Sequence, residues 1–194
     1  LIIIVSFIYC FITGCSGQDP YQWITVLPKP WTLSENQVSE LLPKFHERFP
    51  NFHQRLKAIN IWRVGTPYGI FKLGEEIEPD PDPILRIDTS DCTVHVLTSI
   101  AFTNSKDWKQ ARNNMIDIHY KADEKGKKFP TFKSRWHYTS DRITYNPYTR
   151  DKTLSLIKPS FLDSVQLTLN KKSDESEFLD LDWSSYRTVY FIPN

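Results

Sequence analysis

Glycine is scarce in this chain, at 6 of 194 residues, and there is no Gly-rich loop of the kind that cradles phosphates. No serine lies in a G-x-S-x-G turn, which excludes that type of serine nucleophile. The 5 histidines form no HExxH motif and no i,i+4 pair, and no CxxC occurs, so we expect neither a metal nor a cofactor. The net charge is only +1, which argues against nucleic acid as a partner.

Cysteine is also scarce, and Cys92 is the only one beyond an apolar stretch at the start of the chain. A lone cysteine cannot form an internal disulfide, and one thiol cannot hold zinc without partner ligands. Cys92 follows Ser90 and Asp91, which are common helix caps, so we expect it in the first turn of a helix. There the helix dipole and unpaired backbone N–H groups favour the reactive thiolate. The alternative is a small, buried apolar side chain.

Residues 1–14 are almost wholly apolar, and Cys15 follows directly after them. The run is shorter than the roughly 20 residues of a membrane-spanning helix and fits the apolar part of an export signal. The residues before Cys15 resemble a bacterial lipobox. We therefore expect a signal-peptide remnant over 1–14, loss of Cys10 with it, and a lipid anchor at Cys15 that holds an exported lipoprotein in the bacterial cell envelope, on the periplasmic side of a membrane. An apolar strand or helix of the fold is the alternative.

The remaining chain predicts helices first and strands later, the order typical of an α+β fold. We expect a tether over 15–31 and one domain over 32–194. The pattern predicts helices over 32–48, 51–64, from 91 onward and over 106–118, and strands over 84–87, 153–157, 165–169 and 188–192. The acidic, proline-rich segment 75–83 is typical of a solvated surface loop.

The first predicted helix has a capping signal at its N-terminus and a proline in its middle. Thr32 and Glu35 have the spacing of a capping box, and Pro43 predicts a kink or an early end. The helix that begins near Cys92 is apolar on nearly all sides, which predicts a central position in the fold.

Three segments in order resemble the N-acetylmuramoyl-L-alanine amidase-like family, a branch of the NlpC/p60 superfamily of papain-like cysteine peptidases and amidases. They are 65–68 (GTPY), 88–93 (DTSDCT) and 134–141 (SRWHYTSD), within a resemblance that covers about half of the chain. Each motif alone is weak, whereas all three in order in an exported chain are fairly specific. The resemblance implies a papain-like α+β fold with the nucleophile at a helix start and an antiparallel sheet after it.

The resemblance implies hydrolysis of an amide in peptidoglycan, of the muramoyl–alanine type, with peptidoglycan or a muropeptide as the substrate. Cys92 would be the nucleophile and would form an acyl-enzyme that water then cleaves. Asp91 matches the residue that precedes the family's nucleophile, although a plain N-cap explains it equally well. Tyr68, in the first motif, would line the groove or contact the ligand. Aromatic residues, at 14% of the chain, suit such a wall and also fill cores.

Arg135, His137 and Tyr138 match the family's Arg-x-His-Tyr string. Arg135 could pair with a substrate carboxylate, Tyr138 could orient the reacting groups, and His137 could hydrogen-bond the substrate. The alternative for all three is a buried polar network that stiffens a long loop.

The chain departs from the family pattern because no histidine follows His137, whereas the family places its base on a downstream strand. We therefore expect a fragment that is truncated at both ends and inactive on its own, with an incomplete sheet. His95, three residues after Cys92, is expected to pack rather than to act as the base. The second hypothesis is a non-catalytic envelope lipoprotein that binds peptidoglycan fragments in a papain-like groove.

Overall fold

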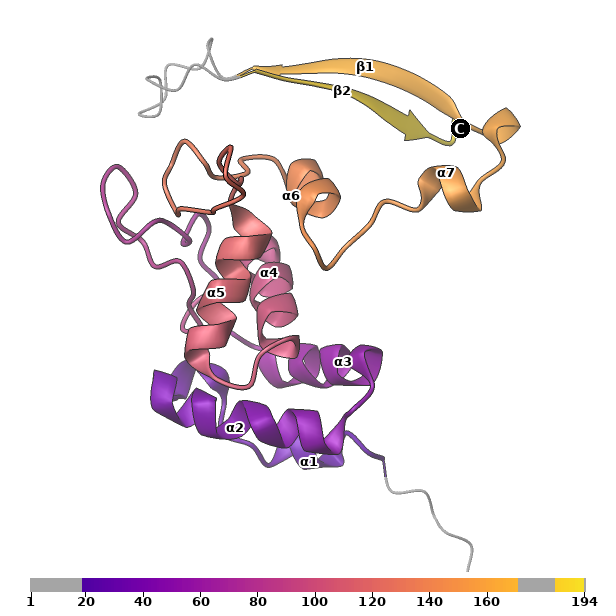
Figure 1. The fold of residues 1–194 in the computed structure, drawn as a ribbon. Coiled ribbons are helices and arrows are strands. Elements are labelled where there is room, and N and C mark those ends of the chain that lie inside the picture. The colour runs from indigo at the N-terminus through magenta and orange to yellow at the C-terminus, as the bar shows by residue number, and fades with distance from the viewer. Residues whose placement is uncertain (1–18, 171–183, 194) are drawn as a thin grey trace, which may run out of the picture. The chain divides into compact units, whose positions relative to one another are not determined.

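The computed structural model describes residues 19–170 and 184–193 (Figure 1). The predicted signal remnant, Cys10 and Cys15 lie outside these residues. Within the described part the fold is α+β, as expected, with seven α-helices and one two-stranded antiparallel sheet. None of the described helices has the length and apolar character needed to cross a membrane.

The chain folds into two compact units. Of the described residues, one unit contains 19–72 and 85–112, and the other contains 73–84, 113–170 and 184–193. The helices are α1 Gln22–Thr25, α2 Glu35–Arg48, α3 Phe52–Arg63, α4 Cys92–Thr103, α5 Trp108–His119, α6 Thr139–Tyr145 and α7 Thr153–Leu156. Short 3-10 turns lie at Pro30–Thr32 and Pro159–Phe161, and the strands are β1 Asp163–Asn170 and β2 Ser184–Phe191.

Helix α2 begins two residues later than the predicted capping box. Ser34 is the N-cap, and its backbone and hydroxyl form a reciprocal box with Gln37. Thr32 instead ends the 3-10 turn, so the box predicted at Thr32 and Glu35 is wrong. Pro43 lies inside α2 without ending it. The buried Phe45 follows it in the same helix, and tertiary packing here outweighs the local cost of proline.

The second half of the expected tether is packed against the helices of the first unit. Tyr21 stacks on Phe49 with ring centroids 5.3 Å apart, and Trp23 meets the ring of Phe45 edge-on at 5.1 Å. Trp62 of α3 donates its indole N–H to the carbonyl of Pro28 at 2.8 Å. These aromatic contacts bury apolar area that a free tether would leave in water, so the segment from about residue 21 is part of the fold.

Helices α3 and α4 pack on each other in the first unit. Arg55 lies in the first turn of α3 and is buried. It donates to the carbonyls of Phe49 and Thr103 at 2.9 and 2.8 Å. These carbonyls lie at the ends of α2 and α4, where no helical partner remains for them. The predicted central position of α4 is confirmed, since most of its residues after the first turn are buried.

Two predicted strands of the chain are absent. Residues 84–87 form no strand in the structure, and 153–156 form the short helix α7. Asp151 accepts a hydrogen bond from the N–H of Thr153, which starts a helical turn in a sequence with strand-like composition. The other two predicted strands are confirmed as β1 and β2, which pair from Asp163 opposite Phe191 to Asn170 opposite Ser184 (Figure 1).

Candidate active site

Cys92 is the first residue of α4, and its side chain is exposed and free. Asp91 caps the helix, since its Oδ1 accepts the N–H of Val94 at 2.7 Å. The N–H groups of Cys92 and Thr93 have no partner within the helix, because the first turn lacks preceding carbonyls. The thiol thus meets solvent at the positive end of a helix whose residues from Leu97 to Thr103 are buried.

A short loop before the acidic segment is attached to the residues that precede Cys92. Ser90 donates its N–H to the carbonyl of Pro67 at 2.8 Å, and Gly69 donates to the carbonyl of Ser90 at 3.2 Å. A Cβ on Gly69 would lie 2.4 Å from the Thr89 hydroxyl, so a larger residue at this close approach would displace that hydroxyl. Tyr68 pairs with Ser90 as an isolated parallel bridge, and its side chain is 80% exposed.

Beneath the first turns of α4 lies the buried guanidinium of Arg63. It donates to the carbonyl of His95 at 2.5 Å and to the Ser99 hydroxyl at 2.8 Å. Burial lowers the pKa of Arg63 to about 9. Burial, and then the nearby charge of Arg63, lower the pKa of the half-buried His95 below its usual value, so that its imidazole is neutral at neutral pH.

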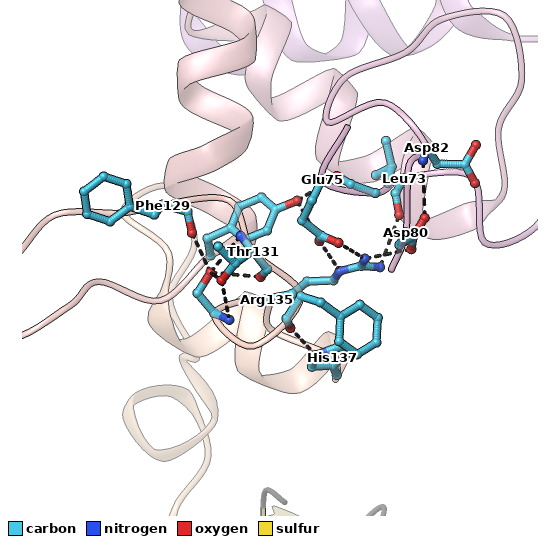
Figure 2. A network of polar contacts seen from close by, with 12 residues as sticks. Leu73, Glu75, Asp80, Asp82, Phe129, Thr131, Arg135 and His137 are labelled. Carbon is cyan, nitrogen blue, oxygen red and sulfur yellow. Dashed lines mark hydrogen bonds and ion pairs between the residues drawn. The ribbon is translucent and has the colours of Figure 1, made fainter. Parts of the chain in front are cut away.

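Arg135 lies in the second unit, at the centre of a polar network (Figure 2). Its guanidinium makes two parallel bonds of 2.6 Å to the carboxylate of Glu75, a third of 2.7 Å to Asp80, and one of 3.2 Å to the carbonyl of Leu73. Burial alone would lower the pKa of Arg135, but the hydrogen bonds that its guanidinium donates to Glu75 and Asp80 outweigh burial and raise that pKa. These contacts match the alternative considered for Arg135, which is a buried polar network that stiffens a long loop.

The same network buries part of the acidic loop. The Glu75 side chain is fully buried, so the prediction of a solvated loop over 75–83 is wrong at this position. The hydroxyl of Tyr120 donates to the carbonyl of Gly74 at 2.8 Å and to Glu75 at 3.1 Å. Burial and then the Glu75 charge raise the pKa of Tyr120. A Cβ on Gly74 would come within 2.5 Å of Asp80, so the loop closes on a glycine.

His137 and Tyr138 follow Arg135 in the second unit. A ring nitrogen of His137 is 2.9 Å from the carbonyl of Phe132, and the two rings are 4.7 Å apart. Tyr138 is the N-cap residue of α6, and its ring lies under the guanidinium of Arg187. Burial raises the pKa of Tyr138, the charge of Arg187 opposes that rise, and the charge of Asp141 adds to it.

His119, at the end of α5, is buried at 2% exposure, and sequence reasoning gave it no role. Neither of its ring nitrogens has a hydrogen-bond partner among the described residues. Burial first, and then the charges of Arg142, Arg135 and His137, place its pKa well below the usual value. Local sequence could not have shown this, because the charged residues that act on the ring come from later in the chain.

The structure thus brings the predicted site residues together in two groups. Tyr68, Asp91 and Cys92 lie in the first unit, and Arg135, His137 and Tyr138 lie in the second. Within the part of the chain that the structure describes, no cluster of three or more His, Cys, Asp or Glu side chains is arranged to hold a metal ion.

Comparison with known proteins gives a family and a fold. A family model described as AmiA-like, N-acetylmuramoyl-L-alanine amidase-like, matches residues 59–194. No curated protein matches the chain. Among solved structures, the fold is similar to that of protein LPG0564 from Legionella pneumophila, a DUF1460 protein, with a TM-score of 0.59 and 19% identity over 85% of this chain and 65% of that one. The chain therefore spans 65% of the length of that protein, and at this identity the likeness shows the fold alone.

Proposed function

The chain belongs to the AmiA-like family of N-acetylmuramoyl-L-alanine amidase-like proteins, and on this premise we propose that it is a cysteine hydrolase that cleaves an amide in peptidoglycan. The family itself implies a peptidoglycan-related function. The thiol mechanism, the papain-like NlpC/p60 classification, the lipid anchor at Cys15 and the location in the bacterial cell envelope are parts of the proposal.

The exposed, unpaired Cys92 at the start of α4 carries this proposal. Its thiolate attacks the carbonyl carbon of the amide, the C–N bond breaks, and the amine leaves with a proton. Water then hydrolyses the thioester, with a base to accept its proton, and releases the acid and the thiolate. The N–H groups at the first turn of α4 are suited to stabilise the oxyanion that forms in both steps.

The other candidate residues take supporting roles in the proposal. Asp91 fixes the first turn of α4, and Tyr68 supplies an exposed aromatic wall. His137 and Tyr138 are proposed to contact the substrate. Arg135 is held by two carboxylates, so we assign it to positioning the loop 73–84 rather than to binding a substrate carboxylate directly.

One observation favours the second candidate, a non-catalytic protein that binds peptidoglycan fragments. Among the described residues, no hydrogen bond joins the sulfur of Cys92 to a histidine. A thiol without a base would leave a groove that binds and does not cleave.

Incubation with a muramyl peptide separates the two candidates. We expect the intact gene product to release a peptide with an N-terminal L-alanine, detected by mass spectrometry, and Cys92→Ala to release none. Thr93→Ala, which changes the next side chain and keeps the thiol, is the matched control and should retain release. Unchanged turnover in Cys92→Ala would refute the mechanism, and binding without cleavage by the unmodified protein would identify the non-catalytic binder.

A further inference from the structure

Next to the nucleophile lies a loop with three exposed apolar side chains, Tyr68, Ile70 and Phe71. Phe71 is the most exposed of them, at 85%, and its backbone has a φ of 54°. Left-handed backbone is unfavourable for a bulky residue that is not glycine. Folding therefore places the ring in water and also strains its backbone. Neither burial of the ring nor backbone preference explains why a phenylalanine occupies this position.

The strained conformation of Phe71 is held by Asp91. The N–H of Phe71 donates to Oδ2 of Asp91 at 3.3 Å, while Oδ1 of the same carboxylate caps α4 through Val94. One carboxylate therefore fixes both the loop and the helix turn that carries Cys92. The strain persists because the surrounding contacts define the loop, which is the pattern found where an unusual backbone serves a function.

A second set of bonds fixes the other end of the loop. Pro67 accepts the N–H of Ser90 at 2.8 Å and the hydroxyl of Thr89 at 3.1 Å, and Gly69 packs directly on Thr89. The loop is thus anchored on residues 89–91, immediately before the nucleophile. The backbone that carries Tyr68 and Phe71 therefore cannot move away from residues 89–91 without breaking these bonds.

We infer that Phe71 is a specificity-determining residue of the proposed hydrolase, held by Asp91 as an apolar wall beside Cys92. This rests on the proposed function and names the part of the substrate that the wall recognises. In a muramoyl–alanine amide, the lactyl and alanyl methyl groups and the C–H face of the sugar lie next to the scissile bond. An aromatic ring in contact with these groups removes apolar surface from water on both sides.

Binding of N-acetylmuramoyl-L-alanyl-D-isoglutamine to the Cys92→Ala protein tests the inference without turnover. Calorimetric titration should give a Kd about tenfold higher when Phe71→Ala is added, as expected for the loss of one aromatic contact. The Kd with Phe71→Leu should lie between that of the parent and that of Phe71→Ala. Phe129→Ala, which removes another exposed phenylalanine ring in the second unit, should leave the Kd unchanged. An equal Kd for Phe71→Ala and its parent would overturn the inference.

Phe71→Gly distinguishes recognition from a merely structural role. Glycine adopts the left-handed backbone freely, so this variant should melt at the same or a higher temperature and still bind the muramyl peptide weakly. A lower melting temperature with an unchanged Kd would show that the ring only supports the loop, which contradicts the inference.

Failure of the proposed function has a different signature from failure of this inference. If the Cys92→Ala protein does not bind the muramyl peptide and the parent with Cys92 does not cleave it, the proposed function is wrong, and the inference with it. If the peptide binds or is cleaved and Phe71→Ala behaves as its parent does, only the inference is wrong.

Discussion

At the scale of single residues, burial changes what a side chain can do. His119 is enclosed at the end of α5, with charged neighbours that disfavour a proton on its ring. A ring N–H of His46 donates to the carbonyl of Ser105, and burial and then the charge of Arg55 lower the pKa of His46 as well. Both rings are neutral in the folded protein at neutral pH.

The low pKa of His119 predicts a loss of stability in mild acid. Its pKa is depressed in the folded state, so below the unfolded value of about 6.5 the unfolded chain binds a proton that the folded protein does not. The free energy of unfolding should be level above that pH and fall below it, by up to about 1.4 kcal/mol per pH unit for one group. Urea denaturation at pH 7.5 and pH 5 measures the slope.

His119→Phe keeps a ring in the space and removes the titration, so its slope should be smaller than that of the unmodified protein. His53→Phe, on the surface of α3, is the matched control and should keep the full slope. If His119→Phe and the unmodified protein lose stability equally between these two pH values, the ring does not titrate in this way.

At the scale of elements, the segment 73–84 is fixed by side chains from far along the chain. Arg135 reaches Glu75 and Asp80, 60 and 55 residues away, and Tyr120 reaches Gly74 and Glu75. A charged loop that is bound in this way behaves as part of the second unit. Local composition predicted only that it would be polar and without regular structure.

Breaking this network should be costly. Arg135→Met leaves the buried carboxylate of Glu75 without its cation, and we expect the free energy of unfolding to fall by about 3–5 kcal/mol. Arg86→Met removes a cation from Asp88, whose side chain is 62% exposed, and should cost only about 0–1 kcal/mol for that ion pair. Urea denaturation of both variants gives the comparison.

The double variant Arg135→Met with Glu75→Gln provides the control for this interaction. Because Glu75→Gln removes the charge that Arg135→Met would leave unpaired, the double variant should lose less stability than the sum of the two single changes. Strict additivity would show that the two side chains do not stabilise each other.

At the scale of the whole molecule, the described sheet consists of a single hairpin. Val165, Leu167 and Phe191 are each about two-fifths exposed on it, and each strand has one unpaired edge among the described residues. Open edges with apolar side chains are templates for pairing with another chain. We therefore expect this 194-residue chain to associate as its concentration rises.

Light scattering over a range of concentrations measures that association. Val165→Lys, on the side of β1 that carries Leu167, should reduce it strongly, because a charge on that side resists pairing. Gln166→Lys places the same charge on the opposite side and should reduce it less. A chain that stays monomeric at high concentration, or variants that do not differ, would contradict this account.

The sequence by itself determined the local features of the chain. The cap at Asp91 and the helix that begins at Cys92 depend on neighbouring residues only, and the family segments were visible in order. Its errors arose where local signals were weak or nearly balanced. Thr32 and Ser34 are both acceptable caps, and the residues after Thr153 have the composition of a strand but form a helical turn.

Only the tertiary structure decided which polar groups are buried and which apolar groups are not. Burial of Glu75 requires the guanidinium of Arg135, and burial of His119 requires the loop that follows it, so neither can be predicted from neighbouring residues. The exposed Phe71 is bonded through its backbone N–H to Asp91, 20 residues away. Burial is set by contacts between distant segments, because the free energy of a charge or a ring depends on everything that surrounds it.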